Sequence, residues 1–182
     1  MKKFLIVSVL AALVVPAASL GSGPTGQDRE HASRACRDLR ATLGVALFRQ
    51  TYGTVQSNRR NAFGKCVSRW ARAEHQNRLS ARAECSAEQA DANFPATHDG
   101  KTFAEHYGTG PKLRNAFGKC VSSKAKAASD QTRENTVNAA RECKAERVQL
   151  GAGPFREKYG RNASDRNAFG KCVSQLAKAK TA

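Results

Sequence analysis

The sequence predicts an all-α fold made of three disulfide-stapled helical-hairpin repeats, forming a bundle or a short array. Three observations predict this fold. The nonapeptide Arg-Asn-Ala-Phe-Gly-Lys-Cys-Val-Ser occurs three times without a change, at residues 60–68, 114–122 and 166–174. Six cysteines accompany the copies, one inside each copy and one before it. The apolar residues around them recur with the 3.6-residue period of a helix.

Residues 1–19 have the composition of a secretory signal peptide. Lys2 and Lys3 precede an apolar run over residues 4–15, and small residues follow this run. The run is too short to span a bilayer comfortably, and this order of segments is typical of a peptide that is removed during export. We therefore expect a soluble, secreted product, either extracellular or associated with the cell wall, with residues 20–27 as a flexible leader.

Three repeats are expected to follow, at residues 28–74, 75–128 and 129–182. In each repeat, small or apolar residues stand four before and seven after the first cysteine, which predicts a packing face on a first long helix. Gly44, Asn93 and Gly151 come next and are expected to end that helix. A Phe-x-x-x-Tyr-Gly segment then predicts a short helix, whose two aromatic rings are expected to pack in the core.

Each nonapeptide is expected to begin a second long helix. Its Phe, Cys and Val share one helical face, and its Gly lies at the flank, where another backbone can approach closely. Its Lys lies on the opposite side, so Lys65, Lys119 and Lys171 are expected to project into water. The Walker phosphate loop is disfavoured, because it needs a further glycine and a hydroxyl residue after the lysine.

The second long helix of one repeat is expected to continue into the first helix of the next. This applies to residues 70–81 and 124–139, with Ser129 and Asp130 as a candidate interruption of the second stretch. Their short polar side chains favour turns and helix caps over helix interiors.

The six cysteines are expected to form disulfides within the repeats, although fifteen pairings exist in principle. The first cysteine of each repeat lies about as far before the hairpin connection as the second lies after it, roughly 10 Å at the rise of a helix. Antiparallel helices bring such positions level. The expected pairs are Cys36 with Cys66, Cys85 with Cys120, and Cys143 with Cys172.

A metal site is disfavoured by the sequence, and no cofactor is indicated. No two cysteines stand at Cys-x-x-Cys spacing, and the four histidines occupy no repeated position.

The paired cysteines, Phe-x-x-x-Tyr-Gly and Asn-Ala-Phe-Gly-Lys-Cys-Val-Ser together resemble a repeat in uncharacterised secreted proteins of actinobacteria. The resemblance covers nearly all of the chain after residue 19. It implies secretion and the repeat boundaries given above, and it implies no catalytic activity.

Positive charge is concentrated in the nonapeptide helices. Without Lys2 and Lys3 the chain has 29 basic and 15 acidic side chains, a formal charge of +14. Residues 59–82 contain seven bases and one acid, residues 112–126 five bases and no acid, and residues 83–107 one base and five acids. A cationic stripe along one side of the array would bind polyanions with an affinity that falls as salt rises. The candidate contacts are Arg59, Arg60, Lys65, Arg114, Lys119, Arg166 and Lys171.

The sequence therefore predicts a secreted, non-catalytic binding or structural module for anionic extracellular or cell-envelope polymers. One alternative is a secreted antimicrobial or antagonistic protein that acts on anionic membranes. Another is a hydrolase with a site between repeats, for which a pocket converging on His98 or His106 would be the first sign. No histidine stands beside an evident nucleophile with an orienting acid, so the sequence indicates no enzyme and no small-molecule substrate.

Overall fold

The structure, a computed structural model, describes residues 23–54, 58–160, 165 and 167–180. The expected signal peptide at residues 1–19 lies outside these residues. The described part of the chain contains seven α-helices and no strand, which confirms the all-α prediction. The helices are α1 (Gly26–Tyr52), α2 (Ala62–Ala90), α3 (Phe94–Thr97), α4 (Phe103–Tyr107), α5 (Ala116–Leu150), α6 (Ala152–Tyr159) and α7 (Ala168–Ala179).

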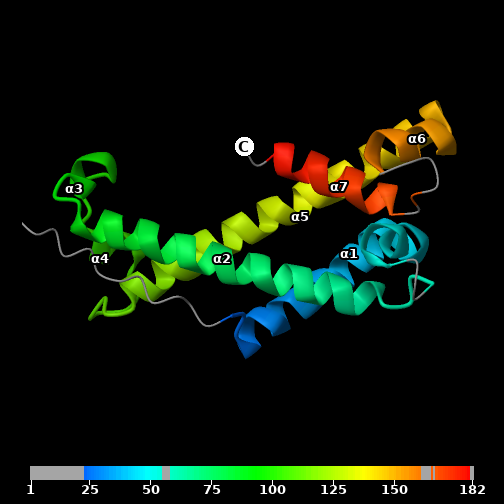
Figure 1. The fold of residues 1–182 in the computed structure, drawn as a ribbon. Helices are drawn as coiled ribbons and strands as arrows, with labels where there is room; N and C mark the ends of the chain where they lie inside the picture. The colour runs from blue at the N-terminus through cyan, green and yellow to red at the C-terminus, as the bar shows by residue number, and fades with distance from the viewer. Residues whose placement is uncertain (1–22, 55–57, 161–164, 166, 181–182) are drawn as a thin grey trace, which may run out of the picture.

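Two long helices, α2 and α5, form the frame of the molecule (Figure 1). Helix α1 packs along the first half of α2, and the second half of α2 packs against the first half of α5. Helix α7 packs on the second half of α5. The molecule is therefore elongated, with α3 and α4 at one end and α6 with the start of α7 at the other (Figure 1).

Helix α1 begins earlier than expected because a capping box fixes its first turn. Thr25 Oγ1 accepts a hydrogen bond from the Asp28 backbone N–H, and the Thr25 backbone N–H donates to Asp28 Oδ2. Gly26 and Gln27 belong to this helix, so the expectation of a flexible leader through residue 27 is wrong for them. Gly44, with φ 73°, breaks the helical path where a stop was expected.

The other two expected stops also lie at helix ends. Gly151, with φ 80°, separates α5 from α6, and Asn93 caps α3 after α2 has ended at Ala90. The positive φ explains the glycine, since most residues with a side chain are strained in this conformation.

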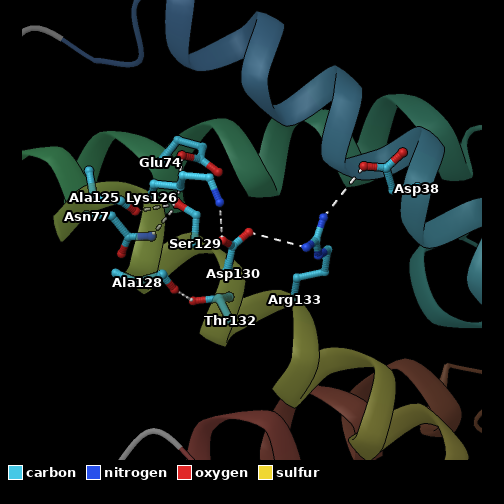
Figure 2. A network of polar contacts seen from close by, with 10 residues as sticks. All are labelled: Asp38, Glu74, Asn77, Ala125, Lys126, Ala128, Ser129, Asp130, Thr132 and Arg133. Atoms are coloured by element: carbon cyan, nitrogen blue, oxygen red, sulfur yellow. Dashed lines mark hydrogen bonds and ion pairs between the residues drawn. The ribbon is translucent and has the colours of Figure 1, made fainter. Parts of the chain in front are cut away.

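Helix α5 continues through Ser129 and Asp130, so the interruption expected there is wrong. Ser129 Oγ donates to the carbonyl oxygen of Ala125 one turn earlier, at 2.9 Å. Asp130 accepts hydrogen bonds from Lys126 and Arg133 on its own helix (Figure 2). These side chains find partners on the helix surface instead of competing for the backbone of a turn. The expected boundaries after residues 74 and 128 consequently fall inside α2 and α5.

Three disulfides join the described helices, and their pairing is the predicted one. The Cα atoms of the bonded cysteines lie 6.0 to 6.1 Å apart, a separation that suits a disulfide between neighbouring helices. Each disulfide lies within a separate apolar cluster, and every cysteine side chain is fully buried. The core is thus divided into three small clusters, each with a covalent link. The pairs are Cys36–Cys66, Cys85–Cys120 and Cys143–Cys172.

The glycine of the nonapeptide is needed for close packing in one of its three copies. A Cβ atom on Gly170 would lie 2.8 Å from the carbonyl oxygen of Thr51, at the end of α1. The same atom on Gly64 or Gly118 would have nothing within 4 Å. The expected close backbone approach therefore occurs only where α7 meets α1.

Candidate functional site

The structure places the residue after the first nonapeptide copy against the third copy, and the second copy lies apart. The first copy begins α2 and the third begins α7, and Arg69 of α2 donates from Nη1 to Ser174 Oγ of α7 at 2.9 Å. The second copy begins α5 at the opposite end, near α4 (Figure 1). About 23 residues of α5 separate Cys120 from Cys143, which is roughly 35 Å of helix. The basic segments of the first and third copies therefore lie toward one end of the elongated molecule, and that of the second copy lies toward the other (Figure 1).

Two adjoining hollows lie where α1 ends against α2, α5 and α7, and together we call them the junction site. The inner cavity has a volume of about 210 Å³ and is bounded by Tyr52, Trp70, Asn135 and Val173, among others. The outer groove has a volume of about 380 Å³ and includes Lys171. Thr51, Arg69 and Ser174 line both hollows.

Tyr52 contributes a hydrogen-bond donor to the inner cavity. Its hydroxyl oxygen accepts the indole N–H of Trp70 at 3.1 Å, and this pair is buried. Burial raises the pKa of Tyr52, so the phenol stays protonated at neutral pH. Because the indole donates and the oxygen accepts, the O–H of Tyr52 retains its own capacity to donate.

Asn135 supplies a second donor from the middle of α5. The side chain is only 5% exposed, and its Oδ1 accepts a hydrogen bond from Gln131 at 2.9 Å. Its Nδ2 has no hydrogen-bond partner in the described part of the chain. A buried donor left unpaired costs about 1–3 kcal/mol, so the cavity is suited to a group that accepts hydrogen bonds.

Cations complete the junction site. Arg69 lines both hollows, Lys178 lines the cavity and Lys171 lines the groove. Asp165 pairs with Lys171, but among the described residues no carboxylate lines either hollow. The site therefore favours a ligand that is anionic and rich in acceptors.

The seven predicted polyanion contacts have different environments. Arg60, Lys65, Arg114 and Lys119 are exposed, as expected. Arg59 is half-buried and adopts φ 61°, with its Cβ close to Gly53. Lys171 does not project alone into water as expected, because its ammonium pairs with Asp165. Arg166 lies outside the described residues.

The second nonapeptide copy lies beside acidic residues. Lys124, at the position that Trp70 has in the first copy, pairs with Glu88 at 2.9 Å and Glu84 at 3.3 Å. Lys126 pairs with Asp130. The acidic and basic segments that the sequence shows separately thus meet in space, and part of the positive charge at this end is compensated.

Sequence reasoning missed the residues that shape the inner cavity. Asn135, Tyr52 and Arg69 come from three helices and share no motif. The sequence predicted Tyr52 only as a core residue of the Phe-x-x-x-Tyr-Gly segment, and no sequence signal identified Asn135, an isolated amide within a long helix.

His98 and His106 lie close together, away from the junction site. Their ring centroids are 4.7 Å apart, and His98 stacks on Phe94 at 3.7 Å. No group of three or more His, Cys, Asp or Glu side chains suited to hold a metal occurs among the described residues. Within the same residues, no helix combines the length and apolar character needed to cross a membrane.

A third hollow, which we call the three-helix groove, lies between the first half of α1, α2 and the first half of α5. It has a volume of about 600 Å³. Its wall from α5 includes Phe117, Gly118 and Val121 of the second nonapeptide copy. Ion pairs and hydrogen bonds bridge its helices, among them Arg133 with Asp38 and Ser129 with Glu74 (Figure 2).

Asp28 is the most constrained carboxylate of this groove. Burial alone would raise its pKa, but the hydrogen bonds from Arg78 and Thr25 outweigh burial and hold the pKa of Asp28 well below its usual range. Arg78 donates from Nε at 3.2 Å and from Nη2 at 2.9 Å. This bidentate pair fixes the start of α1 on α2.

A substitution of Glu74, which lies in the same groove, is expected to change the stability of the protein by an amount that depends on pH. Burial raises its pKa, while the hydrogen bond from Ser129 opposes this only in part. A raised folded-state pKa favours folding at low pH, and this contribution is lost as pH rises through the raised value. Glu74→Gln is therefore expected to raise the melting temperature near pH 8 and to change it little near pH 4.

Thermal unfolding followed by circular dichroism across this pH range tests the prediction. Glu134→Gln, an exposed substitution on α5, is the matched control and should show no such trend. A melting-temperature difference between Glu74→Gln and the parent that stays constant with pH would contradict a raised pKa of Glu74.

Comparison of the chain with protein-family profiles, with characterised proteins and with solved structures finds no match. The function is therefore inferred from the chemistry of the junction site.

Proposed function

We propose that the protein is an exported, non-catalytic module that binds an anionic cell-envelope or extracellular polymer at the junction site. The observation that carries this proposal is the set of groups lining the two hollows. Among the described residues they supply the cations Arg69, Lys171 and Lys178 and the buried amide of Asn135, without a carboxylate. Export is supported by residues 1–19 and by the three disulfides, which are typical of oxidising compartments.

Arg69 is suited to hold an acidic group of such a polymer. Its guanidinium carries five N–H donors in a planar fork, and one of its nitrogens contacts Ser174. The remaining donors match a carboxylate or a phosphate. Trp70 and Val173 provide apolar surface in the adjoining cavity, against which the body of a polymer unit can pack.

The surroundings of the site favour a chain over a single small anion. Lys65 lies one turn before Arg69 on the same face of α2, and Arg60 lies just before this helix. Both side chains are exposed. They extend the positive surface away from the hollows, so that successive acidic groups of one chain can be bound together.

Disulfides hold the two walls of the site in place before a ligand arrives. Arg69 lies three residues after Cys66, and Ser174 lies two residues after Cys172. Both cysteines are bonded to neighbouring helices. A site that is already ordered loses less conformational entropy on binding.

Removal of Arg69 together with the two bases that extend the positive surface beside the junction site is expected to weaken polyanion binding selectively. The triple variant Arg60→Gln, Lys65→Gln and Arg69→Gln should bind heparin or an acidic wall polymer less tightly than the parent. The slope of log affinity against log salt concentration should become shallower by roughly 2 to 3, because binding with fewer basic contacts releases fewer counterions. Isothermal titration calorimetry at several salt concentrations measures both effects.

The matched control is Lys112→Gln, Arg114→Gln and Lys119→Gln, which removes the same charge from exposed positions at the second copy. It should weaken binding less. An equal loss of affinity in both variants would mean that binding depends only on the overall charge of the protein, and it would refute the junction site. Dye release from anionic vesicles at low protein concentration would instead favour the membrane-disrupting alternative.

A further inference from the structure

The inner cavity of the junction site is lined by hydroxyl groups that act as hydrogen-bond acceptors. Each of them donates its proton to the backbone carbonyl oxygen four residues earlier in its own helix, at 2.7 to 2.9 Å, and they are Thr51, Thr132, Thr136 and Ser174. Because a hydroxyl has a single proton, each of these groups can only accept a hydrogen bond from a ligand. Ser174 already accepts one from Arg69, whereas the threonine oxygens have no donor among the described residues.

The same cavity also supplies donors. The O–H of Tyr52 retains its capacity to donate, since its oxygen accepts the indole N–H of Trp70. The amide Nδ2 of Asn135 has no partner among the described residues, and this side chain is 5% exposed. A ligand that satisfies both sets of groups must itself donate and accept several hydrogen bonds.

The remaining wall of the cavity is apolar and the space is small. Trp70, Ala73, Val173 and Ala177 complete the lining. The volume of about 210 Å³ lies below the range of about 300–1,000 Å³ that is typical of sites for drug-sized ligands. The cavity therefore suits one compact unit with apolar faces and with donors and acceptors around its edge, which is the chemistry of a sugar ring.

Other anionic units match this set of groups less well. Ionised phosphate and carboxylate groups only accept hydrogen bonds, so their oxygens would face the threonine oxygens with no proton between them. A peptide backbone offers one N–H per residue, which is fewer donors than the three threonine oxygens accept. A single sugar ring carries several hydroxyl groups, and each of these both donates and accepts.

We propose that one ring of an acidic polysaccharide occupies the inner cavity, with its carboxylate on Arg69. This inference rests on the proposed function and narrows the anionic polymer to one built of uronic acid units. Arg69 lines both hollows, so it can bind the carboxylate while neighbouring units follow the outer groove past Lys171. The ring hydroxyls donate to the threonine oxygens and accept from Tyr52 and Asn135.

Tryptophan fluorescence reports on a ligand that enters the cavity, because Trp70 is the only tryptophan of the chain and lies in the cavity wall. The protein is titrated at moderate salt with oligomers of galacturonate, glucuronate and mannuronate, and with polyphosphate of the same charge. At least one oligouronate should change the emission of Trp70 and bind about tenfold tighter than polyphosphate, the effect of one or two further hydrogen bonds. Polyphosphate should bind through the bases alone and leave the emission unchanged.

Thr136→Val separates a sugar from a simple anion. The substitution keeps nearly the same side-chain shape and removes one acceptor from the cavity, so it should weaken oligouronate binding about fivefold to tenfold and leave the affinity for polyphosphate unchanged. Ser68→Ala is the matched control, because this hydroxyl also bonds to its own helix but is exposed and lines neither hollow. It should change neither affinity, and circular dichroism checks that both variants are folded.

The outcomes distinguish this inference from the proposed function. Equal binding of all oligouronates and polyphosphate, weakened alike in the triple variant at Arg60, Lys65 and Arg69, would overturn the sugar ring and keep the junction site as an anion site. Binding that ignores the triple variant would refute the junction site itself. Tighter binding of polyglutamate than of any oligouronate, together with a loss in Thr136→Val, would indicate a peptide ligand and would also overturn the inference.

Discussion

Reduction of the three disulfides is expected to unfold the protein at room temperature. The disulfides link residues 29, 30 and 35 positions apart, and in the chain-entropy model each stabilises the fold by about 3.5–4 kcal/mol. Together they contribute about as much as the whole stability of a typical domain, which is about 5–15 kcal/mol. The divided core adds to this dependence, because each small cluster buries little apolar surface by itself.

Thermal unfolding followed by circular dichroism, with and without a phosphine reductant, measures this effect. The oxidised protein should show a cooperative transition, and the reduced protein should lose most of its helical signal at 25 °C. A reduced protein that keeps its helical signal and its cooperative transition would show that apolar packing holds the fold without the disulfides.

The disulfide between Cys85 and Cys120 should act locally. The cluster around it contains three further buried residues, Phe94, Phe103 and Ala116. Replacement of both cysteines by alanine is therefore expected to increase amide hydrogen exchange in α3 and α4 before the rest of the molecule opens. The same replacement of Cys143 and Cys172 serves as the control and should leave exchange in α3 and α4 unchanged.

Gly170→Ala is expected to destabilise the protein, although the same change at the two identical positions is not. The new Cβ would lie 2.8 Å from the backbone oxygen of Thr51, so α7 must move away from α1. Such overpacking costs typically about 1–3 kcal/mol. Gly64→Ala and Gly118→Ala meet no neighbour and should stabilise their helices by up to about 1 kcal/mol.

Urea unfolding of the three variants tests this difference in sign. Because the local sequence is the same at all three sites, each variant is a control for the helix propensity of the others. Equal changes in stability would mean that the close approach of α7 to α1 has no energetic weight.

The helices and the disulfide pairs could be predicted because their signals are local or follow from helix geometry. The spacing of Phe, Cys and Val identifies a helix within each nonapeptide. The equal distances of Cys36 and Cys66 from their connection identify the pair once the helices are antiparallel. Ser129 and Asp130 are the exception. Such residues often end a helix, but here their side chains form hydrogen bonds with residues of α5 and, for Ser129, with Glu74 of α2, so the helix continues.

The candidate sites could not be predicted, because they depend on contacts between residues far apart in the sequence, which no local pattern contains. Lys65, Lys119 and Lys171 have identical sequence neighbours, yet Lys171 pairs with Asp165 while the other two are exposed. Asn135 became a candidate donor only because α7 and α2 enclose its amide. The acidic residues that partly neutralise the second basic segment come from a different helix.

The sequence by itself determined that the chain forms helices, where most of them end, and which cysteines meet, because backbone hydrogen bonding and residue spacing act over a few turns. The tertiary structure decided that the third copy of the nonapeptide lines the junction site, beside Arg69 just after the first copy, while the second copy lines a separate groove. The physical reason is that identical helical surfaces differ only in which neighbour covers them, and that neighbour is set by the packing of α1, α2, α5 and α7 over long sequence distances.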